Sequence, residues 1–215
     1  MEVSISEQEL DRRSKVLIGV IALLQGLGLY WLNYTLDNEL WPTGNWSVQA
    51  VIGTFLLMIP CCISLSYRSD YPQKKYWSWL AVLTVLFIWI PWYGSYQLNS
   101  RNLFNHYFFF IPLSFLLAYI SLFFLKAFMR EDRWIPSYGA LFGFSWHLFL
   151  SFILAWIFTF IFWLILLLWG SLFEIVNIDF FKELFKEKWF LYPALSLAFA
   201  YAIVMFRTKI NAVGA

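Results

Sequence analysis

His147 is the residue in the apolar part of this sequence that is best suited to catalysis or to ligand binding. It stands third in the run SWHLFLSFILAWIFTFIFWLILLLWGSLF, residues 145–173, which carries no acid and no base after it. An imidazole can serve as a metal ligand, as a haem ligand or as a general base. A metal site needs several ligands. No second His or Cys stands at the i+3 or i+4 position, and the other histidine, His106, falls in a different apolar stretch. The sequence therefore predicts no metal and no cofactor, and it favours a His147 that bonds to lipid headgroups or to a hydroxyl such as Ser145 or Ser151.

Motifs for nucleophilic or nucleotide chemistry are missing from the sequence. Ser95 in YGSYQ and Ser171 in WGSLF each follow a glycine, but neither completes the G-x-S-x-G pattern of a nucleophile elbow. The zinc-protease pattern H-E-x-x-H, the P-loop and the dinucleotide-binding glycine pattern are not found. We therefore predict that the protein is not an enzyme, and a membrane enzyme that depends on His147 is the least favoured alternative.

The composition is that of a polytopic membrane protein. Of the 215 residues, 61% are hydrophobic and only 13% are charged, whereas soluble domains have about 45–50% apolar and about 25% charged residues. Trp, Tyr and Phe make up 23% of the chain, and amphipathic rings collect at membrane interfaces. The net charge is only +2 and no basic tract is present, so no nucleic-acid partner is predicted.

Six stretches approach the roughly 20 apolar residues that cross the hydrocarbon core of a bilayer. They predict an all-α fold, a single transmembrane domain over residues 1–215, with spans at about 16–34, 46–67, 76–96, 106–128, 145–169 and 189–206. If the N-terminus is cytoplasmic, eleven of the 15 Lys and Arg residues fall on the inner side and four on the outer side. This bias predicts that both termini are cytoplasmic. The N-terminal segment carries four acids before its first base, so we expect no signal peptide and a first span that stays as an anchor.

Two polar connections have helical features of their own. The segment DRWIPSYGALFGF, residues 132–144, is either the beginning of a long fifth helix or a short interfacial helix, with a break near Pro136. In NIDFFKELFKEKW, residues 177–189, Ile178, Phe181, Leu184 and Phe185 share one helical face and the charged residues lie elsewhere. That pattern predicts an amphipathic helix in the outer interface before the last span; an ordinary extramembrane turn is the alternative.

A few residues inside the spans are candidates for helix packing or polar contacts. Gln25 lies in the middle of the first span, where its amide needs a partner worth about 0.6–2 kcal/mol, and we favour a contact between helices over a contact with a substrate. Its neighbour Gly26 would allow close approach of another helix. The full set of candidates is Gln25, Gly26, Asn33, His147, Ala194, Ala198 and Ala202. The adjacent Cys61 and Cys62 have no disulfide or redox spacing and are interpreted as small buried hydrophobes.

Most of the sequence resembles a known family, and residues 160–193 are the most specific part of the resemblance. FWLILLLWGSLF, residues 162–173, is followed by IDFFKELF, by WFLYP and by an Ala-rich last span, and the first span contains LIGVIALLQGLGLYWL. These segments are similar to bacterial multi-pass inner-membrane proteins that are classed as a domain of unknown function. The resemblance implies an inner-membrane location. Family members commonly continue with further spans, so the chain is either a short form or the N-terminal part of a longer protein. Many members carry Arg at the position of His147, which suits an interfacial cation better than a catalyst. The resemblance implies no activity and no functional residues.

The distribution of acids bears on function. All 13 Asp and Glu residues lie in tails or connections, whereas ion-coupled carriers place charges within the membrane. We therefore predict a non-enzymatic membrane component, a subunit or scaffold that packs with a second copy or with other membrane proteins, and that contacts membrane lipids. The alternative is a channel or carrier for a neutral or lipid-like solute, with a cavity that touches Gln25 or Asn33.

Overall fold

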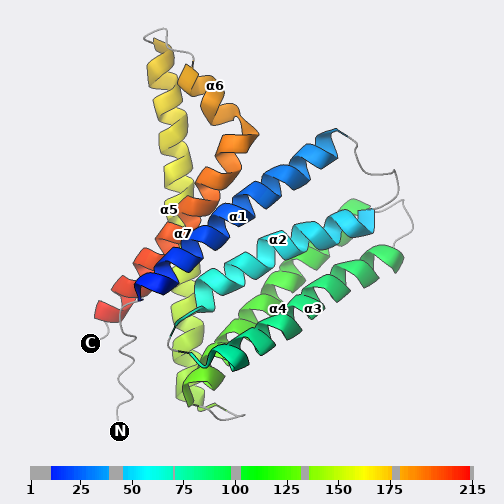
Figure 1. Cartoon of the computed structure of the whole chain (residues 1–215), viewed down its shortest axis with the longest axis vertical. Coiled ribbons are helices and arrows are strands. Elements are labelled where there is room, and N and C mark those ends of the chain that lie inside the picture. Colours follow the sequence, from blue (N-terminus) through cyan, green and yellow to red (C-terminus); the bar gives the residue numbers. More distant parts are fainter. Residues whose placement is uncertain are drawn as a thin grey trace. The chain divides into compact units, whose positions relative to one another are not determined.

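The computed structural model describes residues 11–38, 46–69, 71–97, 103–131, 136–175 and 180–213 (Figure 1). The regular structure in these ranges is entirely helical, which confirms the predicted all-α class. The helices are α1 (Arg12–Asp37), α2 (Trp46–Ser66), α3 (Gln73–Gln97), α4 (Leu103–Glu131), α5 (Tyr138–Ile175), α6 (Phe180–Lys186) and α7 (Lys188–Val213).

Within the described residues, five helices are long and apolar enough to cross a membrane. These segments are Arg12–Asp37, Gln73–Tyr93, Leu113–Glu131, Tyr138–Ile175 and Lys188–Arg207. The second predicted span corresponds to α2, but its described apolar part, Val51–Ser66, is shorter than a span requires. Five of the six predicted spans therefore coincide with a long apolar helix.

Helix α5 is much longer than the predicted span 145–169. It begins at Tyr138, two residues after Pro136, and continues for 38 residues without interruption. Of the two alternatives for this region, the long helix is the one observed. The carboxylate of Glu131, the last residue of α4, accepts hydrogen bonds from the backbone N–H of Ser137 (2.8 Å) and from its hydroxyl (2.6 Å). These two bonds fix the backbone where α5 begins.

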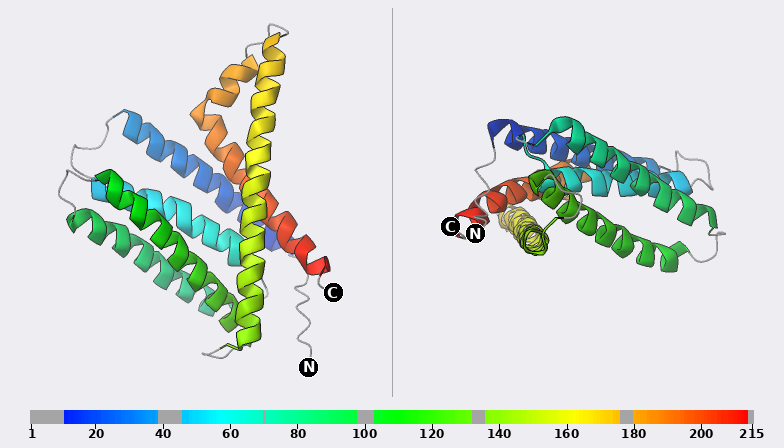
Figure 2. Two further views of the ribbon diagram at one scale, coloured as in Figure 1. Left: turned by 180° about the vertical axis from the view of Figure 1, so that it is seen from behind. Right: turned by 90° about the horizontal axis from the view of Figure 1, so that it is seen from below.

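Residues 31–148 form one compact unit in which α2, α3 and α4 lie side by side (Figure 2). The turn from α2 to α3 is closed by a buried hydroxyl pair, because Ser66 Oγ lies 3.0 Å from Tyr76 Oη and donates to the carbonyl of Cys62 at 2.6 Å. The Tyr76 ring is fully buried and meets the rings of Tyr67 and Trp77 edge to face, each at 5.5 Å. An aromatic cluster therefore holds the first turn of α3 against the last turn of α2.

Residues 1–30 and 149–215 form the second compact unit, which contains parts of α1 and α5 together with α6 and α7. Rings connect α5 to α7: Phe199 lies 6.1 Å from Phe152 and 6.2 Å from Trp156, in edge-to-face geometry. The short α6 packs back onto α5 through Phe173 and Phe181, which stack at 4.3 Å. Aromatic contacts of this kind are worth about 0.5–1.5 kcal/mol beyond the area they bury, so α5, α6 and α7 form one packed group.

Candidate functional site

Gly26 lies at the closest approach between α1 and α7. A Cβ atom at this position would lie 2.8 Å from the backbone nitrogen of Pro193 and 3.0 Å from the carbonyl oxygen of Tyr192, and it would be closer still to Pro193 Cα. All three of these atoms belong to the backbone, so they cannot move as a side chain can. Only a residue without a Cβ therefore allows the two helices to approach this closely.

The same face of α1 carries the rest of this contact. Ile18 and Ala22 precede Gly26 by eight and four residues, so the three lie on one helical face. Ile18 and Ala22 form a buried cluster with Ala200, and Val204 packs against it. Ile18 and Ala22, which precede Gly26, pack with Ala200 and Val204, which follow Pro193, so the two helices run antiparallel.

The small residues predicted in α7 are only part of this arrangement. Ala198 and Ala202 are buried and Ala194 is half-buried. The residue in the cluster with α1 is instead Ala200, two positions from the predicted stripe and on another face of the helix. The spacing of Pro193, Ala200 and Val204, by seven and then four residues, is the signal that would have identified this face.

The two polar candidates of α1 lie eight residues apart along the helix. Gln25 is half-buried. Asn33 is also half-buried, and its Oδ1 atom is enclosed without a hydrogen-bond partner among the residues that the structure describes. Burial of an amide oxygen without a hydrogen bond lowers the stability of the folded protein by about 1–3 kcal/mol, so Asn33 is a destabilising position in α1.

His147 is half-buried in α5. The hydroxyl of Ser145, one of the two hydroxyls predicted as possible partners, is engaged by Tyr119 of α4: the two hydroxyl oxygens are 2.5 Å apart, and Tyr119 Oη donates to the Ser145 carbonyl at 2.9 Å. The side chain of His106 lies outside the described residues. No group of three or more potential metal ligands occurs among the residues that are described, so the described geometry offers no metal-binding set around His147.

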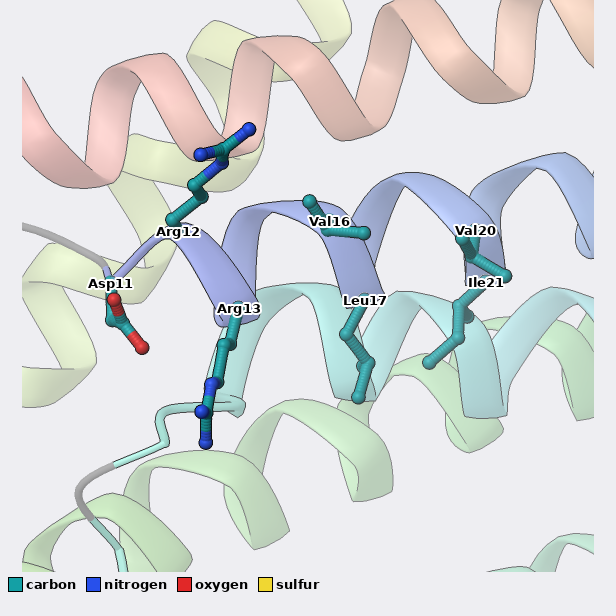
Figure 3. Close-up of a pocket in the computed structure, with 7 residues that line it drawn as sticks. All are labelled: Asp11, Arg12, Arg13, Val16, Leu17, Val20 and Ile21. Carbon is teal, nitrogen blue, oxygen red and sulfur yellow. The ribbon is translucent and has the colours of Figure 1, made fainter.

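A depression of about 620 Å³ lies along the first turns of α1 (Figure 3). It is lined by Asp11, Arg12, Arg13, Val16, Leu17, Val20 and Ile21. Neither Gln25 nor Asn33, which a solute cavity was predicted to touch, is among these residues. The depression combines two cations at one end with branched aliphatic side chains at the other, a combination that was not predicted from the sequence.

Helix α5 presents a long exposed aromatic face. Tyr138, Phe142, Trp146, Trp156 and Phe160 are each more than half exposed. Their spacing of four, four, ten and four residues keeps them on one side of the helix. The helix carries one acid, Glu174, in its last turn and no Lys or Arg. Its exposed surface is therefore apolar over nearly its whole length.

The segment before α7 is helical, as the amphipathic pattern predicted. In α6, Phe181, Leu184 and Phe185 are half-buried, whereas Glu183 and Lys186 are exposed. Ile178, the fourth predicted residue of the apolar face, lies outside the described residues. The apolar face thus packs inward over the part of the segment that is described.

Comparisons of the chain with protein-family models, with curated proteins and with solved structures find no match.

Proposed function

We propose that the protein is a non-enzymatic, multi-pass component of the bacterial inner membrane that packs against a second membrane-protein surface. In this proposal α2 crosses the membrane together with the five long apolar helices, which gives six spans, and both ends of the chain are cytoplasmic. The distribution of Lys and Arg supports the orientation. The resemblance to bacterial inner-membrane proteins, most specific in residues 160–193, supports the location.

The length of α5 is the observation that carries the proposal. Its 38 residues extend about 57 Å along the helix axis. At the average tilt of about 20° the helix would rise about 54 Å, whereas a bilayer with its headgroups is about 40–45 Å thick. Roughly 10 Å of helix therefore extends beyond the lipid. Because α5 has no Lys or Arg and only Glu174 as an acid, most of that excess is apolar and favours a protein partner.

The exposed aromatic face of α5 is suited to that partner. Tyr138 is 82% exposed and Phe142 is 62% exposed, and both belong to the first turns of the helix. Large rings provide much contact area at low cost in side-chain entropy, and they are enriched at protein interfaces. A surface that covers these rings would remove the apolar excess from water.

The positions of the acids disfavour a coupled carrier. In the described helices, Asp37, Glu131 and Glu174 lie in terminal turns. A proton- or sodium-binding step in the bilayer would need a charged group at depth. The packing role requires none.

The test compares two pairs of exposed tryptophans. Trp146→Leu with Trp156→Leu alters the aromatic face of α5, and Trp89→Leu with Trp92→Leu is the matched control, because those rings are similarly exposed on the shorter α3. The full chain is purified in mild detergent and its native mass is measured. We expect the wild type and the α3 control to exceed the 25.6 kDa monomer by a whole subunit, and the α5 variant to lose that subunit. A wild-type protein that is strictly monomeric would overturn the proposal.

A further inference from the structure

The depression on α1 has the polarity of an amphiphile. Asp11, Arg12 and Arg13 form its polar end, and Val16 and Val20 belong to its apolar wall, as the side chains in Figure 3 show. The distance along the helix from the first arginine to the last lining residue is about 13 Å. A phosphate headgroup and the adjoining part of an acyl chain would match this order of charge and apolar surface.

Most of the lining residues point away from the face that packs on α7. At 100° per residue, positions 13, 16, 17 and 20 lie about 120° or more from the centre of the face formed by Ile18, Ala22 and Gly26, whereas Arg12 and Ile21 lie nearer its two edges. Ile18 and Ala22 are buried in the cluster with Ala200. By contrast, Val16 is 58% exposed and Val20 is 54% exposed. The depression is therefore a surface that remains open after α1 and α7 have packed.

The charges select an anionic phosphate. Both guanidinium groups are exposed at the beginning of α1, where the helix dipole also favours negative charge. A guanidinium binds phosphate oxygens in a bidentate way. Asp11 offsets one of the two positive charges, which leaves a single net positive charge for the ligand. A lipid with a net negative charge gains from that charge, whereas a zwitterionic lipid also presents a cation that the arginines repel.

We infer that this depression binds one anionic phospholipid, with its phosphate at Arg12 and an acyl chain along Val16 and Val20, which follow Arg12 on one stripe of α1, while Arg13 adds positive charge at the same end of the depression. The inference rests on the proposed membrane location. The two arginines stand at the first two positions of α1, and only Ser14 and Lys15 separate them from the apolar run that begins at Val16, so in a membrane-spanning α1 they lie at the depth of the headgroup phosphates.

The experiment measures lipid binding to the full chain in detergent by native mass spectrometry. Phosphatidylglycerol and phosphatidylcholine with the same acyl chains are titrated separately. The test variant is Arg12→Gln with Arg13→Gln. The matched control, Lys15→Gln with Lys74→Gln, also removes two exposed cations, and neither of these lines the depression.

We expect the wild type and the lysine control to bind one phosphatidylglycerol at least about tenfold more tightly than phosphatidylcholine, and the arginine variant to lose that preference. Equal binding of the two lipids, or equal losses in the two variants, would overturn the inference. Glycerol phosphate and inorganic phosphate are added as competitors, and competition at the affinity of the lipid would show an anion site without an acyl-chain site.

A separate readout distinguishes failure of this site from failure of the proposed membrane role. The wild type and both variants are expected to stay in the membrane fraction after alkaline extraction, because the substitutions lie in the first turns of α1 and α3 and leave the apolar residues of both helices unchanged. Release of the wild type would contradict the membrane role itself. Retention of all three proteins without a lipid preference would contradict only the lipid site.

Discussion

Replacement of Gly26 by alanine tests the closest helix contact in the structure. The added methyl group would lie 2.8 Å from Pro193 N and 3.0 Å from Tyr192 O, and ordinary van der Waals contact begins near 3.4 Å. Helix α1 and helix α7 would therefore have to separate by several tenths of an ångström or more. The contacts that Ile18 and Ala22 make with Ala200 lie on the same face and would loosen with it.

The size of the effect follows from two opposing terms. Overpacking of a well-packed contact costs about 1–3 kcal/mol. Alanine is favoured over glycine inside a helix by about 1 kcal/mol. Gly19→Ala isolates the second term, because a Cβ at Gly19 would meet no atom within 4 Å. We expect Gly26→Ala to be less stable than Gly19→Ala by about 1–3 kcal/mol.

The assay is reversible unfolding of the full chain in mixed detergent micelles, with helix content as the signal. Wild type, Gly19→Ala and Gly26→Ala are compared under one set of conditions. Gly26→Val should lose more stability than Gly26→Ala, because two further carbons must fit against the same backbone. If Gly26→Ala matched or exceeded Gly19→Ala in stability, the close approach of α1 to α7 would be refuted.

Two further substitutions test polar groups in residues 31–148. Tyr76→Phe removes one member of the buried hydroxyl pair with Ser66 and should lower the free energy of unfolding by about 0.5–1.5 kcal/mol. The control is Ser78→Ala, which removes an exposed hydroxyl that bonds to the carbonyl of Lys74 in its own helix and should change the free energy of unfolding by less than about 0.5 kcal/mol. Equal effects of the two substitutions would contradict the role of the pair. Asn33→Leu removes the enclosed Oδ1 atom and with it a desolvation penalty of about 1–3 kcal/mol, so it should raise the thermal unfolding temperature. A lower unfolding temperature would show that the amide has a partner in the folded protein.

The apolar runs predicted where the helices lie, but they could not predict where α5 begins. A hydropathy pattern reports which residues tolerate lipid, and it therefore placed the fifth span at Ser145. The first turns of α5 depend instead on tertiary contacts. Phe144 is buried beneath the guanidinium of Arg130, which lies 5.8 Å from the ring centroid, and the carboxylate of Glu131 holds Ser137. Each of these contacts joins α4 to the beginning of α5 and leaves no periodic signal in the sequence.

Gly26 was a predictable candidate, whereas its partner was not. A glycine next to a polar residue inside an apolar run indicates close helix approach by itself. Helix α7 carries small residues on more than one face, at Ala198 and Ala202 and also at Ala200. The choice between these faces depends on how α1 and α7 pack in three dimensions, and local spacing in one helix does not contain that information.

The positions of the tryptophans in α5 also support the proposed protein partner. Trp146 and Trp169 are both more than half exposed and lie about 35 Å apart along the helix, close to the separation of the two aromatic belts of a tilted span. Trp156 is 56% exposed and lies between them, about 15 Å from Trp146. If the outer pair marks the two interfaces, an indole at Trp156 is at hydrocarbon depth, where it cannot act as an interfacial anchor. An exposed ring with a polar N–H at that depth is better accounted for by a protein surface with a hydrogen-bond acceptor than by acyl chains. The partner of α5 is therefore expected to cover the helix through the middle of the bilayer as well as at its overlong end.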